Sequence, residues 1–177
     1  MRIRDGDPER DAAPCAEIYA PLVRETAISF EESPPGAEEM ARRIRAAIEW
    51  LVAEDGGTVI GYAYASQHRG RPAYRWAVDV TAYVDSKHRR RGVARELYAA
   101  LFDRLRAGGY RVACAGVALP NEASLGLHRA MGFDEVGTYR RIGWKLRRWH
   151  DVLWLQLDLA PGAPDPPSEP PTSAGPA

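Results

Sequence analysis

Apolar and polar residues alternate between positions 78 and 84, where valine or alanine fills every second position. This period of two is typical of a strand with one apolar face, and its polar face carries Asp79, Thr81 and Tyr83. After Gly92 the spacing changes, because leucines recur every four residues at Leu97, Leu101 and Leu105. The pattern predicts a strand, a short basic loop and an amphipathic helix that ends at two consecutive glycines.

The same patterns divide the rest of the chain into further elements. We expect a short first strand over residues 1–4, a helix capped by Asp11 that Pro21 ends or kinks, and a helix over residues 38–49. A hairpin follows around Asp55-Gly56-Gly57, with strands over residues 50–54 and 58–66. Downstream lie a strand over 110–117, a helix capped by Asn121 and ended by Gly132, and strands over 133–139 and 152–159. The predicted order is βααβββαβαββ.

Composition places the chain among single-domain proteins. Of its 177 residues, we expect residues 1–159 to form one domain and the Pro-rich residues 160–177 to form a disordered tail. The 24 basic residues balance 24 acidic ones, and no aromatic residues are interleaved with the basic loop, so we expect no nucleic-acid partner.

Cysteine and histidine are sparse. Cys15 and Cys114 are isolated, and the four histidines are scattered, so no disulfide framework and no metal site are expected. No apolar run reaches the roughly 18 residues of a membrane span, and the N-terminus lacks an apolar signal region. These features predict a cytoplasmic protein without a membrane partner.

The loop HRRRGVA between the predicted strand and helix suggests an anion site. The first turn of a helix presents unpaired backbone N–H groups and the positive end of the helix dipole, so the stretch Arg90–Arg95 could hold a pyrophosphate. Gly92 would let the backbone approach the ligand closely. Neither GxxxxGK[ST] nor GxGxxG is present; the spacing is Arg89-x-x-Gly92-x-Ala94. A solvent-exposed charge run is the alternative.

This spacing after a strand resembles the acetyl-coenzyme A loop of the GNAT superfamily of N-acetyltransferases. The runs AYRWAVDVTAYVDSKHRRRGVARELY, ALPNEASLGLHRAMGF and GWKLRRWHDV resemble its phosphinothricin N-acetyltransferase branch, over roughly residues 1–157. The resemblance implies the α/β (α+β) GNAT fold, a mixed and mostly antiparallel twisted sheet flanked by about four helices. It also implies acetyl-coenzyme A (acetyl-CoA) as donor, a homodimer, and a small amino-acid-like acceptor such as phosphinothricin, methionine sulfoximine or methionine sulfone.

Acetyl transfer to an amine needs a fixed thioester, a neutral amine and stabilisation of the developing oxyanion. The sequence has no Gly-x-Ser-x-Gly elbow and no convincing Cys–His pair, which favours direct attack by the amine. Asp79 is the candidate general base, because an α-amine is mostly protonated near neutral pH. In the resembled family this position is usually Glu, so the shorter Asp79 would act directly or through water. The alternative is an edge-strand Asp paired with an arginine.

The resemblance also implies roles for other residues. His128 would protonate the departing thiolate, although a packed helix histidine is the alternative. The cofactor would be bound by the strand end, the basic loop and one polar side chain: Ala82, Tyr83, Val84, Arg90, Arg91, Gly92, Val93, Ala94, Arg95 and Asn121. Asn121 has an N-cap as its alternative role, and Phe30 has a core role. The substrate would be bound by Phe30, Arg71 and Tyr74, the latter two at its acidic end.

Two alternative functions remain open at this point. Acetylation of a peptide or protein N-terminus would need an open groove in place of a closed pocket. A catalytically idle acetyl-CoA binding module belongs to a different class, and the intact Asp79 and His128 argue against it. Trp144, Lys145, Trp149, His150 and Asp151 also match the branch, with roles in the pocket wall or a dimer that the sequence does not separate.

Overall fold

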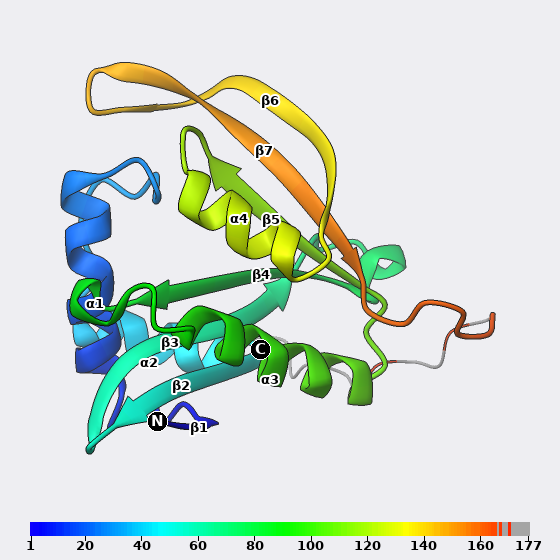
Figure 1. Cartoon of the computed structure of the whole chain (residues 1–177), viewed down its shortest axis with the longest axis horizontal. Coiled ribbons are helices and arrows are strands. Elements are labelled where there is room, and N and C mark those ends of the chain that lie inside the picture. Colours follow the sequence, from blue (N-terminus) through cyan, green and yellow to red (C-terminus); the bar gives the residue numbers. More distant parts are fainter. Residues whose placement is uncertain (166, 168–169, 171–177) are drawn as a thin grey trace.

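A computed structural model describes residues 1–165, 167 and 170. One seven-stranded sheet runs through the molecule in the order β1-β2-β3-β4-β5-β7-β6 (Figure 1). The strands are β1 (Arg2–Asp5), β2 (Glu49–Asp55), β3 (Thr58–Gln67), β4 (Ala77–Val84), β5 (Val112–Ala118), β6 (Asp134–Lys145) and β7 (Arg148–Asp158). The helices are α1 (Ala12–Glu25), α2 (Ala37–Ala46), α3 (Val93–Ala107) and α4 (Glu122–Ala130), with 3-10 turns η1 (Pro72–Tyr74) and η2 (Ser86–His88). The predicted order of helices and strands is confirmed.

Helices cover both faces of this sheet, and each face has its own hydrophobic core. Alternation along β2 shows the division, because Leu51 and Ala53 pack with α3 while Trp50 and Val52 pack with α1 and α2. The core on the α3 side is built around the predicted leucine stripe, Leu97, Leu101 and Leu105, each 0% exposed. The mixed α/β architecture predicted from the sequence is therefore confirmed.

Two details of α1 differ from the prediction. The helix continues past Pro21 to Glu25, so the expectation that Pro21 ends it is wrong. Leu22 and Val23, which follow the proline, are buried in the core between α1, α2 and the sheet, and this packing outweighs the lost backbone hydrogen bond. No helix among the described residues is long and apolar enough to cross a membrane.

Asp11 holds the N-cap position of α1, but its carboxylate makes no cap hydrogen bond. Arg4 of β1 takes both oxygens, with Nη1–Oδ2 and Nη2–Oδ1 distances of 2.6 and 2.8 Å, and Asp7 donates its backbone N–H to Oδ2. Burial raises the pKa of Asp11, but the Arg4 and Asp7 hydrogen bonds outweigh it and leave that pKa below its ordinary value. Asp11 therefore anchors β1 to α1, and its predicted capping role is wrong.

The junction of β4 and β5 leaves room for a ligand-binding site in the sheet. All other strand pairs are antiparallel, whereas these two are parallel and pair only over Ala77–Asp79 and Val112–Cys114. Beyond that point β4 continues to Val84 and β5 to Ala118 on diverging courses (Figure 1). The backbone of β4 after Asp79 is thus released from pairing with β5, and its polar groups can bind a ligand instead.

The predicted Pro-rich tail over residues 160–177 lies largely outside the described residues, and its disorder stays a prediction. Residues 160–165 form bends and turns beside the sheet, where Arg111 donates from Nη2 to the carbonyl oxygen of Pro164 at 3.1 Å. The division into a domain over residues 1–159 and a tail also stays a prediction.

Candidate active site

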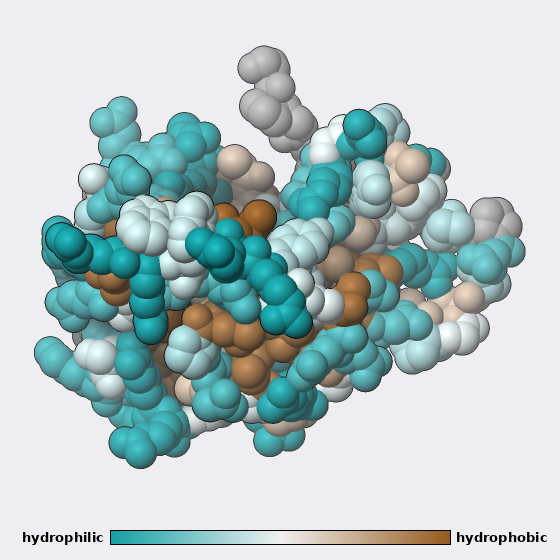
Figure 2. Space-filling model, turned by 90° about the horizontal axis from the view of Figure 1, so that it is seen from above, coloured by the Kyte–Doolittle hydropathy of each residue, from teal (hydrophilic) through white to brown (hydrophobic). Residues whose placement is uncertain are grey.

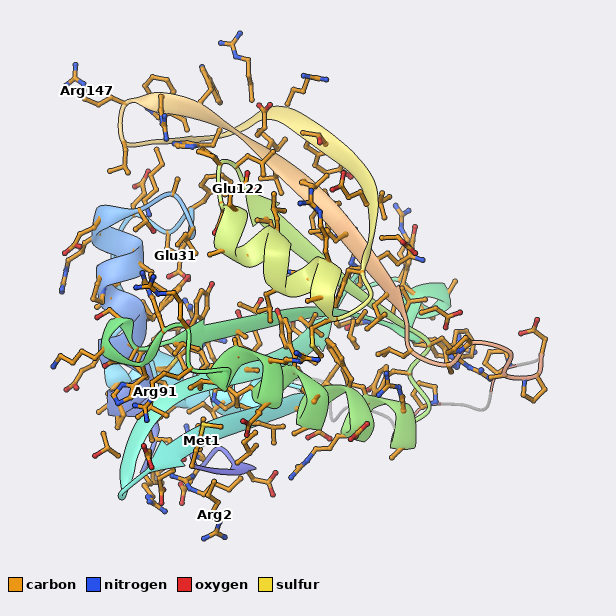
Figure 3. The ribbon with its side chains drawn as sticks, in the orientation of Figure 1. Met1, Arg2, Glu31, Arg91, Glu122 and Arg147 are labelled. Atoms are coloured by element: carbon orange, nitrogen blue, oxygen red, sulfur yellow. The ribbon has the colours of Figure 1, made fainter. Side chains whose placement is uncertain are left out.

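The basic loop joins the end of β4 to the start of α3, as predicted. Gly92 is the N-cap of α3. The first backbone N–H groups of the helix have no intrahelical partner, and glycine has no side chain that could accept from them. Arg89, Arg90 and Arg91 are all exposed beside this helix end. Figure 3 shows Arg91 extending from the loop toward the turn between β2 and β3, where its Nη2 lies 3.9 Å from Asp55 Oδ2. Free N–H groups, a helix dipole and three guanidinium groups together fit a pyrophosphate.

The backbone conformation at position 92 favours glycine. Its φ is +80°, in the left-handed region, and a Cβ added there would meet nothing within 4 Å. Arg90 also has a positive φ of 59°. The protein itself therefore does not crowd Gly92; the glycine permits the turn into α3 and leaves open space where a ligand can approach.

Asp79 lies on β4 at the last residue that pairs with β5. Val78 and Val80 face the core at 0% and 3% exposure, so Asp79 projects from the other face of the strand, as the alternation predicted. Its Oδ1 is 2.6 Å from His68 Nδ1. Burial raises the pKa of Asp79, and the hydrogen bond and charge of His68 and the charge of Arg69 oppose this rise. Because β4 is central and the partner is a histidine, the alternative of an edge-strand Asp paired with an arginine is wrong.

A cavity of about 440 Å³ opens beside Asp79. Its walls come from the loop after α1, the split between β4 and β5, and the hairpin of β6 and β7: Ile28, Phe30, Asp79, Val80, Thr81, Gly116, Ala118, Tyr139, Ile142, Val152 and Trp154. Phe30 is 39% exposed and lines this cavity, so it is available to a substrate and its core interpretation does not hold. A mostly apolar cavity with one carboxylate suits a small molecule with an amine.

The hairpin of β6 and β7 holds the loop after α1 in place. Lys145 Nζ donates to the carbonyl oxygens of Val23 and Ser29 at 2.6 and 2.5 Å. Gly143 passes so close to Phe30 that a Cβ there would lie 2.3 Å from the ring. His150, 2% exposed, hydrogen-bonds the carbonyl oxygen of Lys145 at 3.0 Å. Lys145 and His150 therefore support the loop that carries Phe30, and neither lines the cavity itself.

The remaining predicted residues on α4 have clear structural roles. Asn121 caps the helix, since its Oδ1 accepts from the Ser124 backbone N–H at 3.2 Å. His128 is 4% exposed, its Nδ1 lies 2.8 Å from the Ser124 carbonyl oxygen and its Nε2 lies 3.2 Å from the Tyr98 hydroxyl. Burial lowers the pKa of His128. Packing accounts for these contacts, and the predicted roles of both residues toward the cofactor stay predictions.

Arg71 and Tyr74 do not line the cavity at Asp79. Arg71 precedes the short turn η1 and Tyr74 is its last residue, and both are exposed. The Tyr74 ring lies 6.1 Å from that of His68. Arg69, from the same connector, lines an adjoining cavity of about 340 Å³ with His68, Tyr139 and Trp154. Substrate binding by Arg71 and Tyr74 therefore stays a prediction.

No local pattern in the sequence indicates that His68 or Cys114 lies beside Asp79. Both contacts follow from strand register: Ser66 pairs with Asp79, which makes His68 a diagonal neighbour, and Cys114 pairs with Asp79 across the parallel ladder. Of the described residues, these three side chains form the cluster that could hold a metal ion, with ligand atoms within 4.8 Å of one another. The hydrogen bond between His68 and Asp79 explains their proximity without an ion.

Comparisons with known proteins agree with this geometry. Residues 8–154 match the family model described as an acetyltransferase (GNAT) domain. The chain is 40% identical to a phosphinothricin N-acetyltransferase of Streptomyces coelicolor, covering 90% of this chain and 96% of the relative. It is 32% identical to an L-methionine sulfoximine/L-methionine sulfone acetyltransferase of Salmonella typhimurium, over 90% and 95% of the two chains. A phosphinothricin acetyltransferase of Sinorhizobium meliloti, solved with acetyl-CoA, superposes with a TM-score of 0.91 at 34% identity, over 98% and 96% of the chains.

These matches define the class of the protein as an acetyltransferase. The chain belongs to the GNAT superfamily of acetyltransferases and resembles its phosphinothricin N-acetyltransferase branch. The sequence-based assignment of family, fold and enzyme class is thereby confirmed.

Proposed function

We propose that this enzyme transfers the acetyl group of acetyl-CoA to the α-amine of a small amino-acid-like substrate, with Asp79 as general base. The carrying observation is the position of Asp79 between two features: the cavity of about 440 Å³ and the end of β4, which no longer pairs with β5 and leads to the start of α3. Phosphinothricin, methionine sulfoximine and methionine sulfone are the acceptors that the names of the relatives suggest.

The donor would lie along the split between β4 and β5. Its pyrophosphate would accept hydrogen bonds from the backbone of the loop and first turn of α3, over residues 90–95, with the guanidinium groups beside it. The backbone N–H groups of Ala82 and Val84 face the split, because the alternate residue Tyr83 pairs its backbone with β3. They would orient the thioester and stabilise its oxygen. The Tyr83 side chain packs away from this path, with its ring 4.9 Å from that of Tyr19. Asn121 would reach the pantetheine arm from the start of α4.

In the chemical step Asp79 takes one proton from the substrate ammonium, directly or through water, and leaves a neutral amine. The amine nitrogen attacks the thioester carbonyl carbon, so that a C–N bond forms and the C–S bond breaks. The second proton of the amine passes to the thiolate, for which His128 is the predicted donor. Each turnover thus converts an ammonium and a thioester into an amide, a thiol and one released proton.

The raised pKa of Asp79 suits this role. A carboxylate at its ordinary pKa is a weak base near neutral pH, and burial strengthens it as a proton acceptor. Arg71 and Tyr74 would meet the acidic end of the substrate at the rim, and Phe30 would contact its side chain. Two free cysteines, both buried, are compatible with the predicted cytoplasmic location.

A thiol-release assay with a panel of amines tests this function. Free amino acids, with phosphinothricin and methionine sulfone among them, should be acetylated, whereas the same compounds with a blocked α-amine should release no thiol. Short peptides with free N-termini should be poor substrates, because Ile28 and Phe30 wall the cavity at the loop after α1. Faster turnover of peptides than of any free amino acid would favour an N-terminal acetyltransferase instead.

Replacement of Gly92 by valine should weaken acetyl-CoA binding about tenfold or more, since a side chain would enter the space that the pyrophosphate needs and the φ of +80° would be strained. Isothermal titration calorimetry measures the affinity. Gly109, also at φ +80° but at the other end of α3, offers a matched control. Gly109→Val should carry similar strain and leave the affinity unchanged. Equal acetyl-CoA affinity in folded Gly92→Val would refute the loop assignment.

We also propose a homodimer, as the resemblance predicted. Leu153 and Leu155 of β7 do not supply its surface, because they are buried in the core, as is Leu159 just after the strand. The exposed apolar residues lie on the edge strand β6 and its hairpin: Val136, Tyr139, Ile142, Trp144, Leu146 and Trp149. Figure 2, which views the side on which β6 and β7 lie, shows apolar residues at the middle of this face. A long edge strand with such residues favours self-association.

Light scattering should therefore report a dimer at micromolar concentration, and Trp144→Lys, which places a charge at an exposed side chain of β6, should shift it toward monomer. Lys87→Trp, at a surface position outside β6 and β7, should leave the dimer intact. A monomer at all micromolar concentrations would contradict the proposal.

A further inference from the structure

The pairing of β3 with β4 positions His68 and Asp79 for their hydrogen bond. His68 follows the last residue of β3 and continues its ladder, because its backbone N–H donates to the Ala77 carbonyl oxygen at 3.3 Å. Its side chain therefore reaches diagonally across to Asp79, where Nδ1 and Oδ1 are 2.6 Å apart. The pairing of β3 with β4, extended by one residue to His68, therefore sets this distance.

The imidazole ring is fixed from two further sides. The Trp154 ring lies 6.0 Å away at 80°, and the Tyr74 ring lies 6.1 Å away at 65°, both in edge-on arrangements. The His68 side chain is 16% exposed and the Asp79 side chain 31%. A ring held between two aromatic side chains keeps Nδ1 directed at the carboxylate, so the carboxylate itself is restricted to one orientation.

The hydrogen bond from His68 affects Asp79, the proposed base, in two ways. With Asp79 ionised, Nδ1 must carry the hydrogen, and its donation to Oδ1 leaves Oδ2 as the oxygen for the amine. The same hydrogen bond stabilises the charged carboxylate against the burial that raises its pKa. Without it, Asp79 would be free to rotate and more often protonated, and both changes would lower the population of productive base.

We propose that His68 is a positioning residue for catalysis: it orients the Asp79 carboxylate and keeps it ionised. This inference rests on the proposed function, since it assigns a partner to the proposed base. Other charged or titratable groups near the pair are Arg69 from the connector, Tyr64 on β3, Tyr74 at η1 and Cys114 on β5. Arg69 also favours the ionised carboxylate, and burial together with Asp79 raises the pKa of Cys114 to about 11, so Cys114 stays neutral at neutral pH.

Two substitutions at His68 separate positioning from simple packing. His68→Phe keeps a ring between Trp154 and Tyr74 but removes the donor, and should lower kcat/KM at neutral pH about tenfold or more while acetyl-CoA affinity stays the same. The acid limb of its pH profile should move to higher pH, because Asp79 loses the group that lowers its pKa. His68→Asn keeps an N–H donor at nearly the position of Nδ1 and should restore most of the rate.

Cys114→Ala is the control for a metal ion in the cluster. It removes one candidate ligand and leaves the His68–Asp79 hydrogen bond in place, so its rate and pH profile should match wild type, with or without EDTA. If Cys114→Ala or EDTA reproduces the loss seen in His68→Phe, the cluster holds a metal ion and the inference is overturned.

The inference also fails if His68→Phe, folded by circular dichroism, stays within threefold of wild type with an unmoved acid limb. Should His68→Phe not fold, the pH profile of His68→Asn tests the inference. Its acid limb should stay close to that of wild type, because the amide still donates to Asp79 although it cannot carry charge; an acid limb moved to higher pH would contradict the inference. Failure of the proposed function is a separate result: wild type itself would then release no thiol with any free amino acid.

Discussion

Asp79→Asn should lower turnover about 10²- to 10⁴-fold near neutral pH while fold and acetyl-CoA affinity are retained. General-base catalysis contributes about this factor, equivalent to roughly 3–5 kcal/mol of barrier. Asparagine is nearly isosteric and can still accept the hydrogen bond of His68 through its side-chain oxygen, so the cavity should keep its shape. The defect should shrink at high pH, where the amine loses its proton to solvent and needs no base.

Steady-state thiol release across pH, with acetyl-CoA affinity measured separately, tests this expectation. Asp103→Asn provides a matched control, because Asp103 forms an exposed ion pair with Arg106 on α3 and contacts neither the cavity nor the loop. Its turnover should equal that of wild type. Asp79→Asn activity within about threefold of wild type near neutral pH would mean that water or another residue takes the proton.

Arg4→Met should cost about 3–5 kcal/mol of the free energy of unfolding. Asp11 is 0% exposed, and Arg4 is its bidentate partner, so the substitution leaves a buried carboxylate without its main counter-charge. Because the folded pKa of Asp11 is lowered, the stabilisation by this pair is complete above the unfolded pKa of about 3.9 and is lost as the pH falls through the folded pKa. The loss of stability in Arg4→Met should therefore be large at neutral pH and diminish in acid.

Urea unfolding of three variants checks this account. Arg104→Met removes an arginine that is 42% exposed and pairs with Asp5 and Glu49, and should cost only about 0–1 kcal/mol. Addition of Asp11→Asn to Arg4→Met should recover part of the loss, since the neutral amide needs no counter-charge. If Arg4→Met and Arg104→Met lose the same stability, the buried pair does not anchor α1.

Local patterns were sufficient to predict most of the fold. The alternation around Asp79 and the leucine stripe of α3 reflect burial on one face of an element, which a single sequence shows directly. Asn121 was predicted as a cap because its hydrogen bond spans only three residues. Asp11 had the same local signal, but Arg4, which comes from another element, binds its carboxylate instead. The expectation that Pro21 ends α1 failed for a similar reason, because the residues after it pack in the core and the helix continues to Glu25.

The partners of the candidate base could not be predicted from local pattern. His68 is eleven residues from Asp79 and meets it only through the register of β3 on β4. Cys114 meets it through the parallel pairing of β4 with β5, which depends on a crossover through α3. The sequence likewise shows that the alternate leucines of β7 share one face, but not which face the core covers.

The most direct test of acetyl transfer to an α-amine uses acetyl-CoA labelled with ¹³C in the acetyl group. The enzyme is first mixed with the labelled donor alone, its intact mass is measured, and a free amino acid such as methionine sulfone is then added. We predict that the protein mass stays unchanged, that one thiol is released per amide formed, and that NMR places the label on the α-nitrogen. A labelled protein, or labelled product at any atom other than the α-nitrogen, would contradict direct transfer to this amine.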